Sequence, residues 1–147
     1  IEGIHALNED LTNLIPKHQK FKIYIYMPTI LKSNYRNLFY NTIEKTIQKY
    51  NISGFIISNI SNLKLLENII KDKLYSFELI ANYTFNIFNN YSVNELKDLN
   101  INRFTISPES DKKVITNLCN NFLLPEELIV YGNTPLMNMS YCLNRKN

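Results

Sequence analysis

Residues 77–90 read Phe77-Glu78-Leu79-Ile80-Ala81-Asn82-Tyr83-Thr84-Phe85-Asn86-Ile87-Phe88-Asn89-Asn90. An apolar run passes here directly into a segment in which asparagines alternate with large apolar residues. This pattern predicts a strand that continues into a polar loop, and it predicts that a ligand binds near Asn82 and Asn86. Two strand-and-helix units precede this stretch, and two strands separated by a helix follow it. The stretch is therefore expected to be the third of five strands.

The remaining elements are predicted from apolar periodicity. Period-two or short apolar runs predict four more strands, and apolar residues at i, i+3 and i+4 spacing predict four helices. The strands are expected at residues 21–27, 54–58, 103–107 and 128–132, and the helices at 35–50, 63–74, 92–99 and 114–122. Single helices between strands, with connections too long for hairpins, favour parallel pairing with right-handed crossovers. The predicted fold class is therefore α/β, a parallel series of βα repeats with about five strands.

Some residues are expected to have local structural roles. Ser92 and Glu95 match a capping box at the start of the third helix, and Asn100 stands where a left-handed residue commonly ends a helix. The inward-facing helical residues are expected to include Tyr35, Leu38, Phe39, Ile43, Leu66, Leu74, Cys119 and Phe122. Cys119 is thus expected to be a core thiol and not a reactive one.

Length and composition limit the class of protein. The chain has 147 residues, 45% of them hydrophobic, which suits one domain with its own core. Its 16 basic and 13 acidic residues leave a net charge of +3, too small to indicate a nucleic-acid surface by itself. No apolar run approaches the roughly 20 residues that span a bilayer. Two cysteines, Cys119 and Cys142, cannot form a disulfide framework, which favours a reducing, cytoplasmic compartment.

The domain organisation is expected to be simple. Residues 1–20 carry both histidines, His5 and His18, and are expected to be a linker or lead-in. A histidine there could serve as a catalytic base, and the alternative is a solvated linker. Residues 21–147 are expected to form the domain. Because the chain begins at Ile1 and not at methionine, it is expected to be a piece of a longer protein.

In parallel α/β sheets, ligands bind at the carboxyl ends of the strands. Those ends read Met27-Pro28, Ser58-Asn59, Asn82 to Asn86, Ser107-Pro108-Glu109 and Tyr131-Gly132. The expected substrate-binding residues are Asn59, Asn82, Asn86, Tyr131 and Gly132. Single asparagines are weak evidence here because asparagine is common along the whole chain.

The chemistry of these residues is partly defined by exclusion. The chain has only three glycines and no phosphate-binding glycine loop. None of its serines lies in a nucleophile elbow. Glu109 follows a strand end and is the candidate catalytic residue for acid–base work. The alternative is a glutamate favoured by the dipole of the following helix. Ser107 is expected to be a cap or turn residue, and Cys142 is expected to be either a metal ligand or a free thiol.

A family resemblance is carried by an ordered set of motifs. The set is Ile23-Tyr24-Ile25-Tyr26-Met27-Pro28, Gly54-Phe55-Ile56-Ile57-Ser58-Asn59, Asn82-Tyr83-Thr84-Phe85-Asn86-Ile87-Phe88-Asn89, Ser107-Pro108-Glu109 and Tyr131-Gly132-Asn133-Thr134-Pro135-Leu136-Met137. It resembles the collagenase-like peptidases, peptidase family U32, over residues 21–142. The resemblance implies a half or partial TIM-type barrel, the second half of a barrel of about eight strands.

The resemblance also implies an activity and a cofactor. Members carry a peptidase label, and several relatives are iron–sulfur proteins that hydroxylate RNA bases or a quinone precursor. At their cluster-binding stretch this chain has Pro135 at the first cysteine position and Cys142 at the second. Four thiolates cannot come from this chain alone, so no cofactor is expected in it, and an iron–sulfur cluster is implied for the full-length protein.

Two hypotheses about function follow. In the first, the chain is a domain of a collagenase-like hydrolase, or of a related hydroxylating enzyme, with a site at the strand carboxyl ends and a peptide or RNA substrate. The isolated chain would then be inactive. In the second, it is a non-catalytic scaffold or recognition module. An incomplete barrel leaves unpaired strand edges, so the expected partner is the missing half of the barrel or another copy of the chain.

Overall fold

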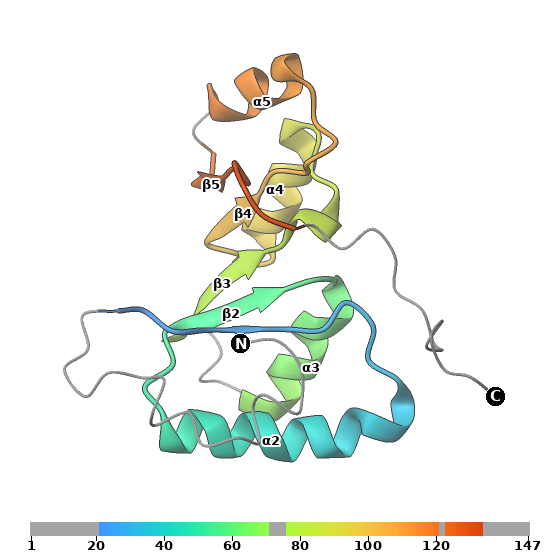
Figure 1. Cartoon of the computed structure of the whole chain (residues 1–147), viewed down its shortest axis with the longest axis vertical. Helices are drawn as coiled ribbons and strands as arrows, with labels where there is room; N and C mark the ends of the chain where they lie inside the picture. Colours follow the sequence, from blue (N-terminus) through green and yellow to red (C-terminus); the bar gives the residue numbers. More distant parts are fainter. Residues whose placement is uncertain (1–20, 71–75, 121–122, 134–147) are drawn as a thin grey trace.

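The computed structural model describes residues 21–70, 76–120 and 123–133, which contain one sheet of five parallel strands (Figure 1). The strands are β1 (Tyr24–Tyr26), β2 (Gly54–Ile57), β3 (Glu78–Ala81), β4 (Arg103–Thr105) and β5 (Glu126–Glu127). Their order in the sheet is the order in the chain, β1-β2-β3-β4-β5. All four neighbouring pairs are parallel, which confirms the predicted α/β fold class.

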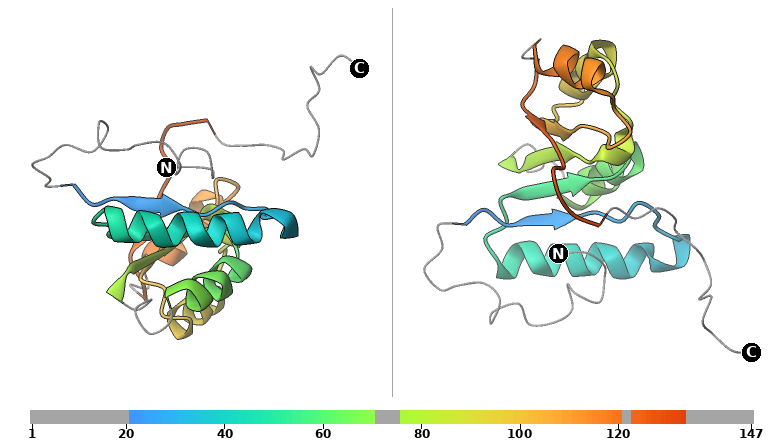
Figure 2. Two further views of the ribbon diagram at one scale, coloured as in Figure 1. Left: turned by 90° about the horizontal axis from the view of Figure 1, so that it is seen from below. Right: turned by 45° about the horizontal axis from the view of Figure 1, so that its top comes forward.

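One α-helix lies between each pair of consecutive strands. The helices are α2 (Arg36–Lys49), α3 (Ile60–Ile70), α4 (Asn90–Asp98) and α5 (Lys112–Cys119), with short 3-10 turns η2 (Ser33–Tyr35) and η4 (Tyr83–Phe85). Because the strand order is sequential, every crossover steps in the same direction, and right-handed crossovers then bring all helices to one face. Figure 2 shows the helices gathered on one side of the sheet. This is the arrangement of a part of a parallel α/β barrel.

The core lies between the sheet and its helices. Ile25, Phe55, Leu79 and Phe104 occupy the middle of four neighbouring strands and are almost completely buried. They belong to one apolar cluster with residues of all four helices, among them Phe39, Leu66, Leu96 and Leu118. Burial of each such side chain stabilises the fold by about 1.5–3 kcal/mol. The alternate strand residues, such as Tyr24, Ile56 and Glu78, therefore point to the helix-free face.

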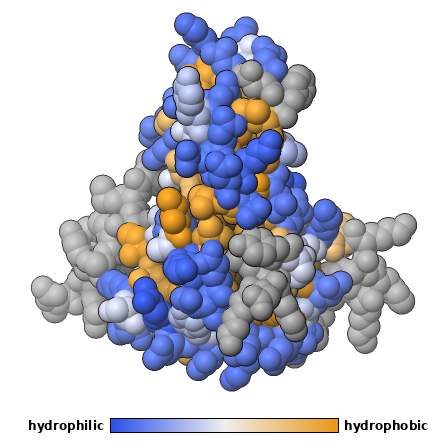
Figure 3. Space-filling view, turned by 180° about the vertical axis from the view of Figure 1, so that it is seen from behind, coloured by the Kyte–Doolittle hydropathy of each residue, from blue (hydrophilic) through white to orange (hydrophobic). Residues whose placement is uncertain are grey.

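The face of the molecule seen from behind is mostly polar (Figure 3). In the space-filling view from behind, hydrophilic side chains cover most of the face, and apolar side chains show between its upper and lower parts (Figure 3). In the described part of the chain, none of the helices combines the length and the apolar character needed to cross a bilayer.

The fifth strand lies earlier in the chain than the sequence predicts. β5 is Glu126–Glu127, and the apolar run expected to form the strand, residues 128–132, follows it as an irregular exposed segment. Figures 1 and 2 show this segment passing over the helix-free side of the sheet. The prediction relied on β-propensity, which favours Leu128-Ile129-Val130-Tyr131 over two glutamates. In the structure the two glutamates, and not the apolar run, pair with β4.

Two predictions about helix starts are also wrong. Helix α4 begins two residues before Ser92, and its N-cap is Asn89, whose side chain accepts a hydrogen bond from the Ser92 amide. Asn89 thus supplies the capping oxygen that was expected from Ser92. In the first predicted helix, Tyr35 and Leu38 are 48% and 45% exposed, because they lie at the 3-10 turn and the first turn of α2, before the helix reaches the core.

Other local predictions are confirmed. Asn100 has a φ of 56°, the left-handed conformation expected after α4. Cys119, at the end of α5, is partly buried against the core cluster. Several expectations fall on residues outside the described ranges, namely those for the linker at 1–20, Leu74, Phe122, Pro135 and Cys142.

Candidate functional site

The carboxyl ends of the first three strands are joined by side-chain hydrogen bonds. The Ser58 hydroxyl donates to the Met27 carbonyl at 2.8 Å, and the Asn62 amide donates to the Pro28 carbonyl at 3.3 Å. In turn the Thr84 hydroxyl donates to the Ser58 carbonyl at 2.6 Å. Each of these loops therefore holds the backbone of the loop before it, and the hydrogen bonds link the carboxyl ends of β1, β2 and β3.

Asn59 and Asn82 lie at this edge, as predicted, and both side chains have protein partners. The Asn59 side-chain amide donates to the Thr29 carbonyl at 2.8 Å. Its side-chain oxygen accepts a hydrogen bond from the backbone amide of Asn62 at 3.0 Å, near the start of α3. Asn82 is only 4% exposed and donates to the Tyr26 hydroxyl at 2.5 Å. These contacts indicate that both asparagines hold neighbouring loops in place.

The other predicted site residues are exposed. Asn86 ends the turn η4 in the left-handed conformation, with a φ of 53°. Glu109 lies in the loop after β4, where its backbone amide donates to the Ser107 hydroxyl at 3.3 Å. Tyr131 is 97% exposed, and Gly132, with a φ of 147°, has none of the described residues within 4 Å of where a Cβ would lie. Packing does not restrict the Tyr131 side chain.

A charged network crosses the helix-free face of the sheet, and its centre is Glu78. The Tyr24 hydroxyl donates to Glu78 Oε2, and the Lys22 ammonium lies 3.3 Å from the same oxygen. Arg103 Nε lies 3.1 Å from Glu78 Oε1. This last contact is an ion pair without hydrogen-bond geometry, because Arg103 Nε has no hydrogen-bond partner among the described residues.

The network continues to the last strand through Arg103. Its Nη1 lies 3.1 Å from Glu127 Oε1, and its guanidinium carbon lies 5.3 Å from the centre of the Tyr24 ring. The Thr105 hydroxyl donates to Glu127 Oε2 at 3.2 Å. We call this set, Lys22, Tyr24, Glu78, Arg103, Thr105 and Glu127, the charged strip. It connects four strands, β1, β3, β4 and β5, through side chains on one face.

Gly54 makes the centre of the charged strip possible. It lies on β2 between Tyr24 and Glu78, which are its register partners on the two neighbouring strands. Register partners in a parallel sheet point to the same face, so a side chain at Gly54 would stand between the two. A Cβ built there would lie 2.0 Å from the Glu78 carbonyl oxygen. The absent side chain lets the phenol reach the carboxylate across β2.

The electrostatics of the strip fix its protonation. The hydrogen bond from Tyr24, helped by the nearby charges of Arg103 and Lys22, lowers the pKa of Glu78 although burial opposes this. Burial, and then the hydrogen bond to Glu78, raises the pKa of Tyr24. At neutral pH Glu78 is therefore a carboxylate and Tyr24 a neutral donor. Such a pair can orient and bind groups, but it is not poised to exchange protons.

The charged strip is not among the features that the sequence pattern predicts. A signal was present, because Glu78 and Arg103 are charged residues that each begin a strand whose next residue is apolar and buried. A charged residue at such a position requires a partner. Which strands would supply the partners depends on register, which the pattern of residues does not specify.

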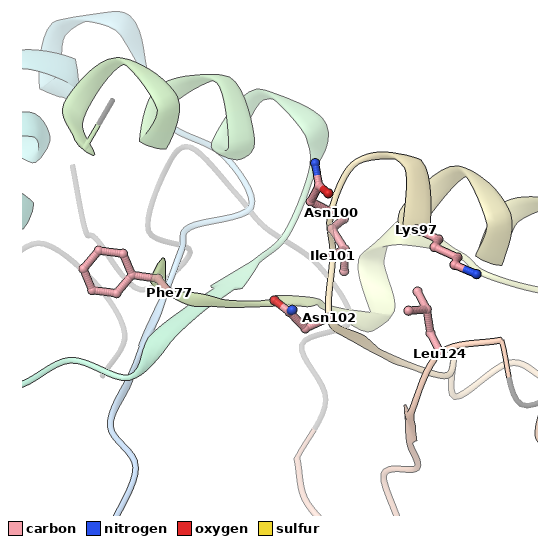
Figure 4. Close-up of a pocket in the computed structure, with 6 residues that line it drawn as sticks. All are labelled: Phe77, Lys97, Asn100, Ile101, Asn102 and Leu124. Atoms are coloured by element: carbon pink, nitrogen blue, oxygen red, sulfur yellow. The ribbon is translucent and has the colours of Figure 1, made fainter. Parts of the chain in front are cut away.

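A hollow of about 740 Å³ lies at the opposite edge of the sheet (Figure 4). It is lined by Phe77, Lys97, Asn100, Ile101, Asn102 and Leu124, which precede the strands β3, β4 and β5 or end helix α4. Asn102 has a structural role there, since its side-chain oxygen accepts a hydrogen bond from the Leu79 amide at 2.7 Å. In α/β barrels this amino-terminal edge contributes to stability, whereas the active site lies at the other edge.

The described residues do not fit a metal or an iron–sulfur centre. No group of three or more His, Cys, Asp or Glu side chains that could hold a metal occurs in the ranges that the structure describes. Cys119 is on the helix side, where its thiol is hydrogen-bonded to Glu126; burial is the main cause that raises its pKa, and this hydrogen bond adds to it. A thiol held in this form is a poor ligand, because metals bind the thiolate.

Comparison with known proteins identifies a family. The model of one protein family, described as peptidase family U32, matches residues 6–146. No curated protein and no solved structure matches the chain.

Proposed function

Because the chain belongs to peptidase family U32, we propose that it forms part of an α/β-barrel peptidase and that a peptide substrate binds at the carboxyl ends of its strands. The observation that carries this proposal is a parallel sheet whose helices, in the part of the chain that the structure describes, all lie on one face (Figure 2). The helix-free face of such a sheet is the inner wall of a barrel, and barrel enzymes bind substrate where this wall meets the strand carboxyl ends.

The proposed roles of the site residues follow from their surroundings. Glu109 is the proposed acid–base residue, since its exposed carboxylate lies in a short turn beside the expected site. Asn86, Tyr131 and Gly132 are proposed to contact the substrate directly, because their loops are open to solvent. Asn59 and Asn82 are proposed to position the loops, because their amides have protein partners.

Further strands are proposed to complete the barrel. Within the described residues, β1 and β5 are the two edges of the sheet, and each pairs on one side only. Unpaired edges favour the addition of strands, either from the missing half of the barrel or from another copy of the chain. Light scattering tests the second source, because a strictly monomeric chain would exclude pairing between copies.

Peptide cleavage by the full-length protein tests the proposal. The full-length protein should cleave the peptides of a fluorescein-labelled gelatin digest. Glu109→Gln should lower kcat/KM for this cleavage by about 100-fold, the usual contribution of a positioned acid or base. Glu44→Gln is the matched control, because Glu44 is an exposed acid on helix α2. Cleavage that is equally fast in both variants would exclude Glu109 from the chemistry. No cleavage by the unmodified protein would contradict the peptidase proposal itself.

A further inference from the structure

Resting on the proposed function, we infer that Glu127 is a specificity-determining residue that binds an ammonium or guanidinium group of a peptide substrate. Glu127 is the last residue of β5 and therefore lies at the carboxyl edge of the sheet. It shares the helix-free face with its register partner Thr105 and with Arg103. This places a carboxylate on the inner wall at the edge where substrate is proposed to bind.

The carboxylate is held in a fixed orientation. Arg103 Nη1 lies 3.1 Å from one oxygen, and the Thr105 hydroxyl donates to the other at 3.2 Å. The side chain is nevertheless 38% exposed, so it is open to a ligand. An ionised carboxylate has about four acceptor sites, and these two contacts occupy two of them. A substrate donor can bind the others without displacing Arg103.

The arrangement of charge favours a cationic donor. Along the charged strip the order is Lys22, Glu78, Arg103 and Glu127, so the acidic member ends the strip at the carboxyl edge. Arg103 is shared with Glu78 and does not neutralise Glu127 alone. Glu109, in the loop after the neighbouring strand β4, adds a second exposed carboxylate to this part of the edge. A lysine or arginine side chain supplies the complementary charge.

Glu126 provides a matched control. It has the same charge and is the adjacent residue in the same strand, but it faces helix α5 and accepts a hydrogen bond from the Cys119 thiol. Glu126→Gln and Glu127→Gln therefore change the net charge equally. Only the second removes charge from the inner wall.

The test uses pairs of labelled peptides. The two peptides of a pair differ at one position, where one has lysine and the other norleucine, and this position is moved along the peptide from pair to pair. Their Kd is measured by fluorescence anisotropy and their kcat/KM by cleavage, at low salt. At the position that meets Glu127, the unmodified protein should prefer lysine by about tenfold, the effect of one charge-assisted hydrogen bond. Glu127→Gln should abolish the preference through KM, with kcat little changed. Glu126→Gln should retain it.

The outcomes separate this inference from the proposed function. Equal binding of the lysine and norleucine peptides by the unmodified protein, or a preference that survives in Glu127→Gln, would overturn the inference alone. If no peptide binds or is cleaved, both proposals fail. Because Glu127→Gln also loosens Arg103, Glu127→Asp serves as a second variant that keeps the charge, and it should retain part of the lysine preference. Loss of preference in Glu127→Asp with an unchanged circular dichroism spectrum would also count against a charge-based role.

Discussion

Replacing Gly54 by alanine tests the close approach of β2 and β3. The new Cβ would lie 2.0 Å from the backbone oxygen and 2.8 Å from the carbonyl carbon of Glu78. Ordinary contact requires more than about 3 Å, so the overlap is on the order of 1 Å or more. The obstacle is the backbone of a paired strand, and it can be relieved only if the two strands separate locally.

The cost of that separation can be worked out from the contacts. Overpacking of this kind costs about 1–3 kcal/mol. The strand hydrogen bond from the Glu78 amide to the Ser53 carbonyl, 3.0 Å long, is strained or lost, for about 1 kcal/mol more. Alanine also lowers the conformational entropy of the unfolded chain, which stabilises the folded state by about 0.5–1 kcal/mol. We expect Gly54→Ala to lower the free energy of unfolding by about 1–3.5 kcal/mol.

Urea unfolding followed by far-UV circular dichroism measures this loss. Gly132→Ala is the control, because a Cβ there would contact none of the residues that the structure describes, so that the positive φ is the feature that disfavours alanine. That strain costs about 1 kcal/mol, the low end of the range for such conformations, because the loop is exposed and can relax. If Gly54→Ala is within about 0.5 kcal/mol of the unmodified protein, or costs no more than Gly132→Ala, the close approach of the strands is refuted.

Other substitutions test the charged strip and the helix ends. Because the folded-state pKa of Glu78 is lowered, its stabilisation is complete above the ordinary carboxyl range and is lost as the pH falls through the lowered pKa. In urea titrations Glu78→Gln should therefore cost about 1 kcal/mol at pH 7 and progressively less as the pH falls below the ordinary carboxyl range. Tyr24→Phe should raise the pKa of Glu78, as followed by carboxyl carbon NMR. Asn89→Ala should cost about 1 kcal/mol and Ser92→Ala less than half of that, since Asn89 is the cap of α4; equal losses would contradict this. Asn100→Ala should lower the thermal midpoint, whereas Asn100→Gly should not, because the φ is 56°.

The part of the fold that could be predicted is the part that depends on local pattern. Ile25, Phe55, Leu79 and Phe104 lie in apolar runs separated by helical periodicity, and all four are in parallel strands with buried side chains. The last strand could not be placed in this way. Glu126 and Glu127 are poor strand formers by propensity, and they pair with β4 in a context where Glu127 is held by Arg103 and Thr105.

The candidate site was predictable only in outline. The rule for parallel sheets located the edge, and Asn59 and Asn82 do lie there. The rule does not predict that the side-chain amides of Asn59 and Asn82 join loops. Their hydrogen-bond partners, Thr29 and Tyr26, are 30 and 56 residues away in the chain. The charged strip also depends on contacts across strands, and none of its ion pairs can be derived from the spacing of residues in the sequence.

The sequential order of the strands has a consequence for biosynthesis. Each strand pairs with the strand that leaves the ribosome immediately before it, and only one helix of sequence separates the two. Such a fold has a comparatively low contact order for a parallel sheet, because each of these strands pairs with one that is near to it in the sequence. The chain can therefore add one βα unit at a time to a growing sheet while translation continues. Arrested nascent chains that end after α3 should already protect the β1–β2 pair from proteolysis, before the strands of the charged strip have all been made.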